Sequence, residues 1–231
     1  MKYMRNILKP LFILIIAFMM NSLNAQDWPN FKEFKEANAL LPQVSQNEKR
    51  VVFMGNSITI GWLQTHPDFF KNKPYVNRGI SGQTTPQMLL RFRADVVDLN
   101  AAAVVLLAGT NDIAGNTGPV TLEMILDNIK SMTEIAHANG IKVILCSVLP
   151  AFDYPWSPGL SPNIKIPKLN AMIKSYAEKS GAYYLDYFSA LEDGNNGIIK
   201  EYTTDGVHLT LKGYQIMEPL VENALQRVLI R

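Results

Sequence analysis

Val51–Thr59, which reads VVFMGNSIT, indicates the fold class of this chain because it joins an apolar strand to a polar loop and the start of a helix. The apolar part is a continuous run, as expected for a strand that is buried on both faces of a sheet. Four further strands are predicted at 75–78, 102–108, 141–147 and 182–185. The apolar runs therefore predict a parallel sheet that is covered by helices on both faces.

Helices are predicted between these strands. The clearest one, at 120–138, repeats apolar residues with the helical period and is followed by Gly140 just past its end. The others are expected between 56 and about 71 and at 84–94, 163–180 and 210–229, with a short helix around Phe31–Leu40. This alternation predicts an α/β fold of three layers. In such sheets ligands bind beyond the carboxyl ends of the strands, so the loops that follow the strands are the ones to inspect.

Residues 1–25 are predicted to be a secretory signal peptide. They combine basic residues at the start, an apolar run at 11–20 and a short polar segment that ends at Ala25. The apolar run is too short to cross a bilayer, which takes about 20 residues. We therefore expect an exported protein, periplasmic or secreted, without stable membrane insertion after cleavage. Residues 26–50 are predicted to be a lead-in segment that packs on the domain, and residues 51–231 to be the domain itself.

The charge balance argues against nucleic acid as a partner. Removing residues 1–25 takes away three basic and no acidic residues, which changes the formal net charge from +2 to −1. A near-neutral chain without basic clusters gives no electrostatic reason to expect nucleic acid or an anionic membrane surface. The sole cysteine, Cys146, lies in an apolar strand-like run and is predicted to be a buried hydrophobic residue. No cofactor is predicted, and the oligomeric state is left open.

Polar residues follow the first three predicted strands. Ser57 can be either a helix N-cap or a nucleophile. Gly82 can make a turn or present its backbone N–H to a ligand. Asn111 can form an Asx-turn or direct its side-chain amide into the same cleft, whereas Asp112 is expected to brace its loop. Each of these residues is ambiguous when it is considered alone.

Asp205 and His208 lie in the loop before the last predicted helix. A carboxylate three residues from a histidine can hold the far ring nitrogen of a general base. The alternative is a pair of metal ligands, but no further His or Cys cluster is available and zinc takes three or four ligands. No metal is therefore predicted. The other histidines, His66 and His137, are expected at a solvent-facing helix start and at a helix end, where the helix dipole favours positive charge.

Together these residues fill every position of a serine hydrolase site. A serine nucleophile needs an adjacent base, the base needs an orienting carboxylate, and the tetrahedral oxyanion needs preorganised donors. Ser57, His208 and Asp205 can serve as nucleophile, base and carboxylate, and Gly82 and Asn111 can serve as donors. The G-x-S-x-G elbow of α/β-hydrolases is absent, which disfavours that fold.

The same residues resemble the four ordered blocks of the SGNH (GDSL-type) hydrolases, whose name lists Ser, Gly, Asn and His. The blocks are Gly55-Asn56-Ser57, Gly82, Gly109–Asp112 and Asp205-x-x-His208. The resemblance runs from about Val51 to the C-terminal helix and is most similar to the acetylhydrolase branch, which includes platelet-activating-factor acetylhydrolase-like proteins and carbohydrate acetylesterases. Asn56 departs from the usual Asp of the G-D-S form. This change leaves the nucleophile in place and bears only on local bracing.

The resemblance implies a flavodoxin-like domain with five parallel strands in the order 2-1-3-4-5 and metal-free ester hydrolysis. It also implies roles for the site residues. Ser57 attacks the ester carbonyl, His208 takes its proton and later protonates the leaving alkoxide, and Asp205 orients His208. The backbone N–H groups of Ser57 and Gly82 and the side-chain amide of Asn111 hold the oxyanion.

The substrate is less well indicated. Phe152, Tyr154 and Trp156, in the loop after the fourth predicted strand, can flank an acyl or sugar group or simply pack that loop. We predict hydrolysis of short-chain acyl esters, acetyl esters above all, on carbohydrate substrates. The alternatives are a lysophospholipase or thioesterase-like acylhydrolase and an inactive glycan-binding relative. The last is disfavoured because Ser57 and His208 are both present.

Overall fold

The computed structural model describes residues 27–45 and 48–230, so the predicted signal peptide lies outside the described residues. Five strands form one parallel sheet in the order β2-β1-β3-β4-β5, which confirms the predicted topology. The strands are β1 (Val51–Gly55), β2 (Tyr75–Gly79), β3 (Ala103–Leu107), β4 (Lys142–Cys146) and β5 (Tyr183–Leu185).

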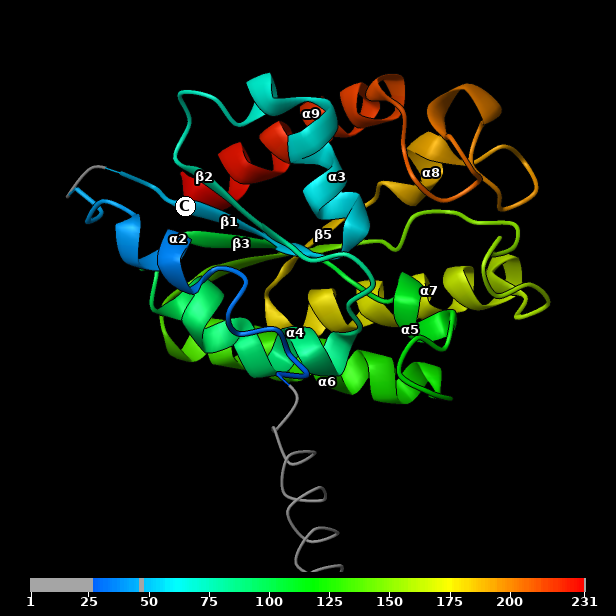
Figure 1. The fold of residues 1–231 in the computed structure, drawn as a ribbon, viewed down its shortest axis with the longest axis horizontal. Helices are drawn as coiled ribbons and strands as arrows, with labels where there is room; N and C mark the ends of the chain where they lie inside the picture. Colours follow the sequence, from blue (N-terminus) through cyan, green and yellow to red (C-terminus); the bar gives the residue numbers. More distant parts are fainter. Residues whose placement is uncertain (1–26, 46–47, 231) are drawn as a thin grey trace, which may run out of the picture.

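Helices cover both faces of this sheet, as Figure 1 shows, and the predicted three-layer α/β/α sandwich is confirmed. One face carries α3 (Ser57–Thr65), α8 (Phe188–Leu191) and α9 (Leu211–Leu229). The other carries α4 (Thr85–Phe92), α6 (Leu122–Ala138) and α7 (Pro162–Ser180). The remaining helical segments are α2 (Lys35–Leu40), α5 (Thr110–Ile113), two 3₁₀ turns at Pro67–Phe69 and Lys200–Tyr202, and a π turn at Arg93–Val97 that continues α4.

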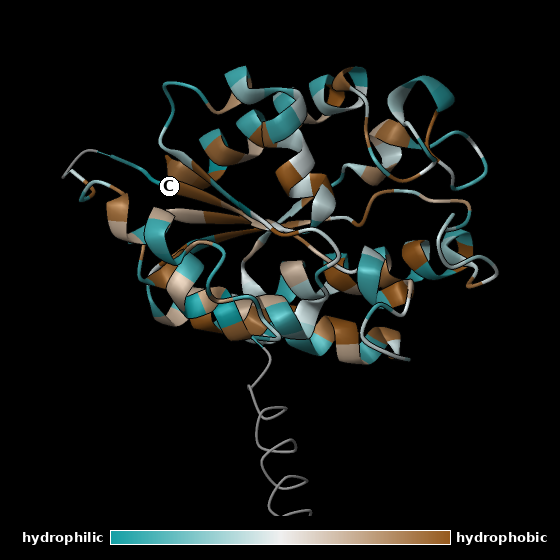
Figure 2. Cartoon of the chain, in the orientation of Figure 1, coloured by the Kyte–Doolittle hydropathy of each residue, from teal (hydrophilic) through white to brown (hydrophobic). Residues whose placement is uncertain are grey.

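The sheet separates two halves of the core, and alternate residues of each strand pack into opposite halves. In β1, Val52 and Met54 pack with α4 and α6, whereas Val51 and Phe53 pack with α3 and α9. Figure 2 accordingly shows brown strands between helices in which brown and teal residues alternate. Cys146 is buried in the second half, as predicted, and burial raises the pKa of its thiol.

Several short elements were not predicted. The helices α5 and α8 have four residues each, too few to show a period in the sequence. The predicted helix at 84–94 instead changes from α-helix to π turn after Phe92. The helix expected around Phe31–Leu40 begins only at Lys35, because the carboxylate of Asp27 accepts hydrogen bonds from the Phe31 and Lys32 N–H groups and holds that stretch as turns.

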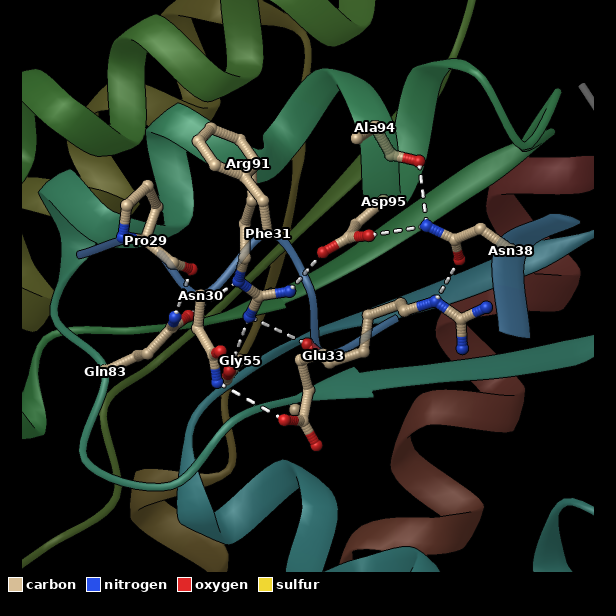
Figure 3. Close-up of polar contacts among 12 residues, drawn as sticks. Pro29, Asn30, Phe31, Glu33, Asn38, Gly55, Gln83, Arg91, Ala94 and Asp95 are labelled. Carbon is tan, nitrogen blue, oxygen red and sulfur yellow. Dashed lines mark hydrogen bonds and ion pairs between the residues drawn. The ribbon is translucent and has the colours of Figure 1, made fainter. Parts of the chain in front are cut away.

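The lead-in segment packs against α4 and against the residues on either side of this helix. The Gln87 side chain donates a hydrogen bond to the Trp28 carbonyl at 2.8 Å. The Asn38 amide donates to a carboxylate oxygen of Asp95 at 2.7 Å and to the Ala94 carbonyl at 3.2 Å (Figure 3). These contacts join the segment to the sandwich, while the division of the chain at residue 50 stays a prediction. Among the described residues, none of the helices has the length and hydropathy that crossing a bilayer requires.

Candidate active site

Ser57 lies at the carboxyl end of β1 as the first residue of α3. The N-cap is its neighbour Asn56, whose side-chain oxygen accepts a hydrogen bond from the Ile58 N–H at 3.0 Å. Asn56 therefore braces this turn, and the Ser57 hydroxyl is not used as the cap. The turn can lie close to β2 because residue 79 is glycine: a Cβ there would overlap the backbone nitrogen of Ile60.

The Ser57 hydroxyl faces the ring of His208. His208 Nε2 lies 3.0 Å from Ser57 Oγ, although the two residues are 151 positions apart in the chain. On the other side of the ring, His208 Nδ1 lies 2.7 Å from Asp205 Oδ2. The structure thus brings the three side chains into one hydrogen-bonded row. The Asp205 carboxylate favours the tautomer in which Nδ1 carries the ring proton. In that tautomer Nε2, which faces Ser57, can accept a proton.

The loop around Asp205 holds its carboxylate in place. Asp205 Oδ1 accepts hydrogen bonds from the N–H groups of Val207 at 2.9 Å and His208 at 2.8 Å. Partial burial raises the pKa of Asp205, but these bonds and the His208 ring lower it by more, so the pKa lies below the ordinary value of the carboxyl. Asp205 therefore stays ionised at neutral pH.

Gly82 lies in the turn after β2 with φ of +75°, a conformation that side-chain-bearing residues rarely adopt. Its carbonyl accepts a hydrogen bond from the side-chain amide of Asn116 at 3.0 Å, which secures the turn. Its N–H makes no hydrogen bond to any residue in the described part of the chain. The Ser57 N–H is likewise beyond the reach of helical carbonyls, because it begins α3.

Asn111 lies in α5, directly after β3, and is buried. Its side-chain nitrogen donates a hydrogen bond to the Gln83 carbonyl at 3.0 Å, across 28 residues of sequence. The side chain therefore bonds across two loops and does not form a local Asx-turn. Because a side-chain amide carries two N–H donors, the second is left for another acceptor.

Asp112, the next residue, braces its loop as predicted. Its carboxylate accepts hydrogen bonds from the Thr85 N–H at 3.0 Å and the Thr85 hydroxyl at 2.6 Å, and so joins α5 to the start of α4. Burial raises the pKa of Asp112, although the bonds from Thr85 oppose that shift. Its partners are structural, and none of them belongs to the Ser57–His208–Asp205 row.

The other two histidines lie elsewhere. His137 is exposed in the last turn of α6, as predicted. His66 caps the end of α3 and is also the N-cap of the 3₁₀ turn Pro67–Phe69, so it does stand at a helix start, as predicted. The solvent-facing part of that prediction is wrong, because His66 is partly buried and its Nδ1 lies 2.6 Å from Glu218 Oε1. Within residues 27–45 and 48–230, no group of three His, Cys, Asp or Glu side chains has an arrangement that could hold a metal ion.

Comparison with known proteins identifies the family of this chain. A model of the GDSL-like lipase/acylhydrolase family matches residues 53–216, which is more than half of the chain. The chain belongs to this family. The match runs from β1 into α9 and includes Ser57, Gly82, Asn111, Asp205 and His208. The SGNH/GDSL resemblance found in the sequence is therefore confirmed, and membership implies ester hydrolysis in general.

Solved structures similar to this acylhydrolase include two from Bacteroides. A Bacteroides fragilis protein assigned as an acylhydrolase is 49% identical, covering 89% of this chain and 100% of that chain, with a TM-score of 0.87. A GDSL-like lipase from Bacteroides thetaiotaomicron is 50% identical, covering 87% of this chain and 98% of that chain, with a TM-score of 0.85. Both share the fold over nearly their whole length.

More distant relatives show less about this chain, because the matches are partial or low in identity. An uncharacterized lipoprotein of Bacillus subtilis is 34% identical over 120 residues, which are 45% of this chain and 49% of that protein. The match thus spans about half the length of that curated relative. An acetylxylan esterase catalytic mutant from Geobacillus stearothermophilus is 18% identical with a TM-score of 0.61, covering 81% of this chain and 96% of that chain. At this identity the likeness shows a shared fold alone.

The three aromatic residues of the loop after β4 lie in different environments. Trp156 is 44% exposed, and its ring centroid lies 6.0 Å from that of His208. Tyr154 is fully buried and stacks beneath Trp156 with centroids 5.2 Å apart, so the prediction that it lines a substrate pocket is wrong. Phe152 is 62% exposed, and its ring does not pair with the ring of His208 as that of Trp156 does. Packing on the core turned Tyr154 inward and left Trp156 beside the site.

Sequence reasoning missed two polar residues behind the acylhydrolase site, Gln83 and Arg91. Both are buried, and their side chains are hydrogen-bonded to each other at 2.6 Å. A signal was present in the sequence. Arg91 lies on the apolar face of α4 with Met88, where a charge requires a partner, and Asp95 follows it four residues later.

Proposed function

We propose that this GDSL-like acylhydrolase is a serine esterase that hydrolyses short-chain acyl esters, acetyl esters above all, on carbohydrate substrates. The observation that carries the proposal is the row Ser57 Oγ, His208 and Asp205, with contacts of 3.0 Å and 2.7 Å on the two sides of the imidazole. These distances are those of hydrogen bonds that can pass a proton from the hydroxyl to the ring.

The first half of the reaction acylates the enzyme. Ser57 Oγ attacks the carbonyl carbon while His208 Nε2 takes the hydroxyl proton, and Asp205 stabilises the imidazolium that forms. The tetrahedral intermediate then collapses, the bond to the alcohol breaks, and His208 returns its proton to the departing alkoxide. In the second half, water attacks the acyl-Ser57 ester with His208 as base and releases the carboxylic acid.

The oxyanion of both tetrahedral intermediates needs donors that are already oriented. We assign this role to the backbone N–H groups of Ser57 and Gly82 and to the second side-chain N–H of Asn111. The assignment is supported by what the three donors share. Each lies just past the carboxyl end of a strand, and each is left free by the contacts described above.

The proposed carbohydrate substrate rests on Trp156. An aromatic ring that is partly exposed and supported from below by Tyr154 offers a flat apolar face beside His208. A sugar ring that carries an acetyl ester can lie on this face while its ester reaches Ser57. The acetylxylan esterase among the fold neighbours is compatible with this choice, although the likeness extends only to the fold.

We also propose that the protein is exported. The basic and apolar pattern of residues 1–25 supports export through a cleaved signal peptide. The lipoprotein relative from Bacillus subtilis is consistent with a protein that works outside the cytoplasm. Cell fractionation of a tagged full-length chain, with an export-deficient variant that lacks residues 1–25 as control, tests this proposal.

The test of the esterase assignment is hydrolysis of p-nitrophenyl acetate by the wild type and by Ser57→Ala. We expect kcat to fall on the order of 10⁴-fold or more with an unchanged circular dichroism spectrum. Ser131→Ala is a matched control, because it removes the same hydroxyl from α6, where it bonds only the Asp127 carbonyl. Equal activity of wild type and Ser57→Ala would refute the nucleophile, and a folded but inactive wild type would favour a glycan-binding relative.

Two further measurements separate the remaining alternatives. Activity that a chelator abolishes would return Asp205 and His208 to the role of metal ligands. A series of acetyl, butyryl and octanoyl esters, followed by an acetylated oligosaccharide, a lysophospholipid and an acyl thioester, compares the substrate classes. We expect the highest kcat/KM for acetyl esters. A preference for the octanoyl ester or the lysophospholipid would instead support a lipid acylhydrolase.

A further inference from the structure

Arg91 is fully buried on α4, behind the loops that carry the proposed oxyanion donors. Its guanidinium Nη2 donates to two backbone carbonyls, Gly55 at 3.2 Å and Arg78 at 2.9 Å. Gly55 ends β1 two residues before Ser57, and Arg78 lies near the end of β2, before the turn that carries Gly82. One buried side chain therefore joins the ends of the two strands that lead into these loops.

The third loop is reached through Gln83. Arg91 Nε donates to Gln83 Oε1 at 2.6 Å, as Figure 3 shows. The backbone carbonyl of Gln83 in turn accepts the hydrogen bond from the Asn111 side chain at 3.0 Å. Gln83 also follows Gly82 directly in sequence. The Arg91–Gln83 pair is thus bonded to all three segments from which the proposed donors come.

The lead-in segment and Asp95 complete the surroundings of this pair. Gln83 Nε2 donates to the Pro29 carbonyl at 2.8 Å, and Arg91 Nη1 donates to Asp95 Oδ2 at 2.9 Å. The ring centroid of Phe34 lies 5.9 Å from the Arg91 guanidinium carbon, and the Arg91 side chain is fully buried. Arg91 is therefore both paired and shielded, as a buried charge must be if it is to hold a fixed position.

We propose that Arg91 and Gln83 are positioning residues for the oxyanion hole, and that they set the relative placement of the Ser57, Gly82 and Asn111 donors. This inference rests on the proposed function. Its physical basis is that donors from three separate loops stabilise a transition state only when they are held to within about half an ångström of the productive geometry. Hydrogen bonds that converge on one planar guanidinium can supply that restraint.

The first test removes the Gln83 side-chain bonds without removing its backbone carbonyl. Gln83→Met should lower kcat for p-nitrophenyl acetate about 10- to 100-fold with little change in KM, because misplaced donors weaken only the transition state. Gln87→Met is the matched control, since Gln87 also bonds a lead-in carbonyl, that of Trp28, but makes no hydrogen bond to Arg91 or Asn111. A purely structural role would lower thermal stability in both variants and leave both kcat values unchanged.

A double-mutant cycle then separates this inference from the proposed function. If Gln83 acts through Asn111, Gln83→Met should lower kcat much less in an Asn111→Ala background than in the wild type. Gln83→Glu keeps an acceptor for Arg91 Nε and loses the N–H that donates to the Pro29 carbonyl. It should therefore recover most of the kcat that is lost in Gln83→Met. It also keeps the inference testable if Gln83→Met does not fold.

Failure of this inference and failure of the proposed function give different results. Fully additive losses in the cycle, or a Gln83→Glu variant as slow as Gln83→Met, would overturn the inference while the esterase assignment stands. An Asn111→Ala variant with unchanged kcat would overturn the oxyanion assignment itself and the inference with it. Strong non-additivity together with recovery in Gln83→Glu would support both.

Discussion

The side-chain nitrogen of Asn111 donates a hydrogen bond to the backbone carbonyl of Gln83, 3.0 Å away. The bond uses one N–H of the amide and fixes the plane of the other, because the amide group is rigid. Asn111 is also buried, so its second N–H acts in surroundings where a hydrogen bond is strengthened by the low dielectric. The hydrogen bond from Asn111 to Gln83 thus holds the side chain in place for the oxyanion-donor role that we assign to it.

We expect Asn111→Ala to lower kcat for p-nitrophenyl acetate on the order of 10²-fold, because one of three oxyanion donors is lost. The free energy of unfolding should fall by about 1 kcal/mol, since the Gln83 carbonyl loses its partner. Steady-state kinetics and urea unfolding measure the two effects. Asn128→Ala removes the same group from α6, where it bonds the Thr85 hydroxyl, and should leave kcat unchanged. A loss of stability without any loss of kcat would refute the donor role.

Asp205→Asn should lower kcat on the order of 10³- to 10⁴-fold while the protein stays folded. The substituted oxygen can still accept the Val207 and His208 N–H bonds, so the loop keeps its shape. The substitution replaces the carboxylate oxygen that faces His208 Nδ1 by a neutral amide group. This group no longer stabilises an imidazolium. Pre-steady-state acylation kinetics measure the effect. A change confined to KM would show that Asp205 does not orient the base.

The stability of the protein should depend on pH through Asp205. Its folded-state pKa is lowered, so its contribution to stability is present above the unfolded pKa of about 3.9 and is lost as the pH falls through the folded value. The difference in unfolding free energy between wild type and Asp205→Ala should therefore be largest at neutral pH and should shrink in acid. Urea unfolding across this range measures it. A difference that does not depend on pH would contradict the assigned hydrogen bonds.

Trp156→Ala should raise KM for an acetylated oligosaccharide about tenfold, because a sugar ring loses its aromatic face. Hydrolysis of p-nitrophenyl acetate should change little, since this substrate has no sugar ring to place. Phe152→Ala is the control from the same loop, as its exposed ring does not pair with the ring of His208. Equal effects of the two variants, or an equal effect on both substrates, would remove the support for a carbohydrate substrate.

Asn56→Ala should reduce the free energy of unfolding by about 1 kcal/mol, because the Ile58 N–H loses its capping partner. Asn56→Asp restores the residue that is usual in the family, keeps the acceptor and should retain stability. Because Ser57 follows the cap directly, we also expect a lower kcat in Asn56→Ala but not in Asn56→Asp. Thermal unfolding and ester hydrolysis measure both. Equal stability of the two variants would show that the cap contributes nothing.

The long elements of this fold could be predicted from the sequence because their signals are local. The strands β1 and β3 are continuous apolar runs, and α6 repeats its apolar residues with the helical period, so each indicates its own structure. The shorter segments were missed for the same reason. The helix α5 is shorter than two turns, and the π turn after Phe92 depends on contacts that its own residues do not reveal.

The sequence by itself determined the parallel sheet, the edge at which polar residues gather and the ordered blocks that identify the family. Only the tertiary structure decided that Asn56 and not Ser57 caps α3, that His208 reaches Ser57, and that Tyr154 turns into the core. It also revealed the buried Arg91, which joins the ends of β1 and β2 behind the proposed oxyanion donors. The reason is physical: periodicity records which face of an element is buried, whereas contacts between distant residues depend on how those elements pack together.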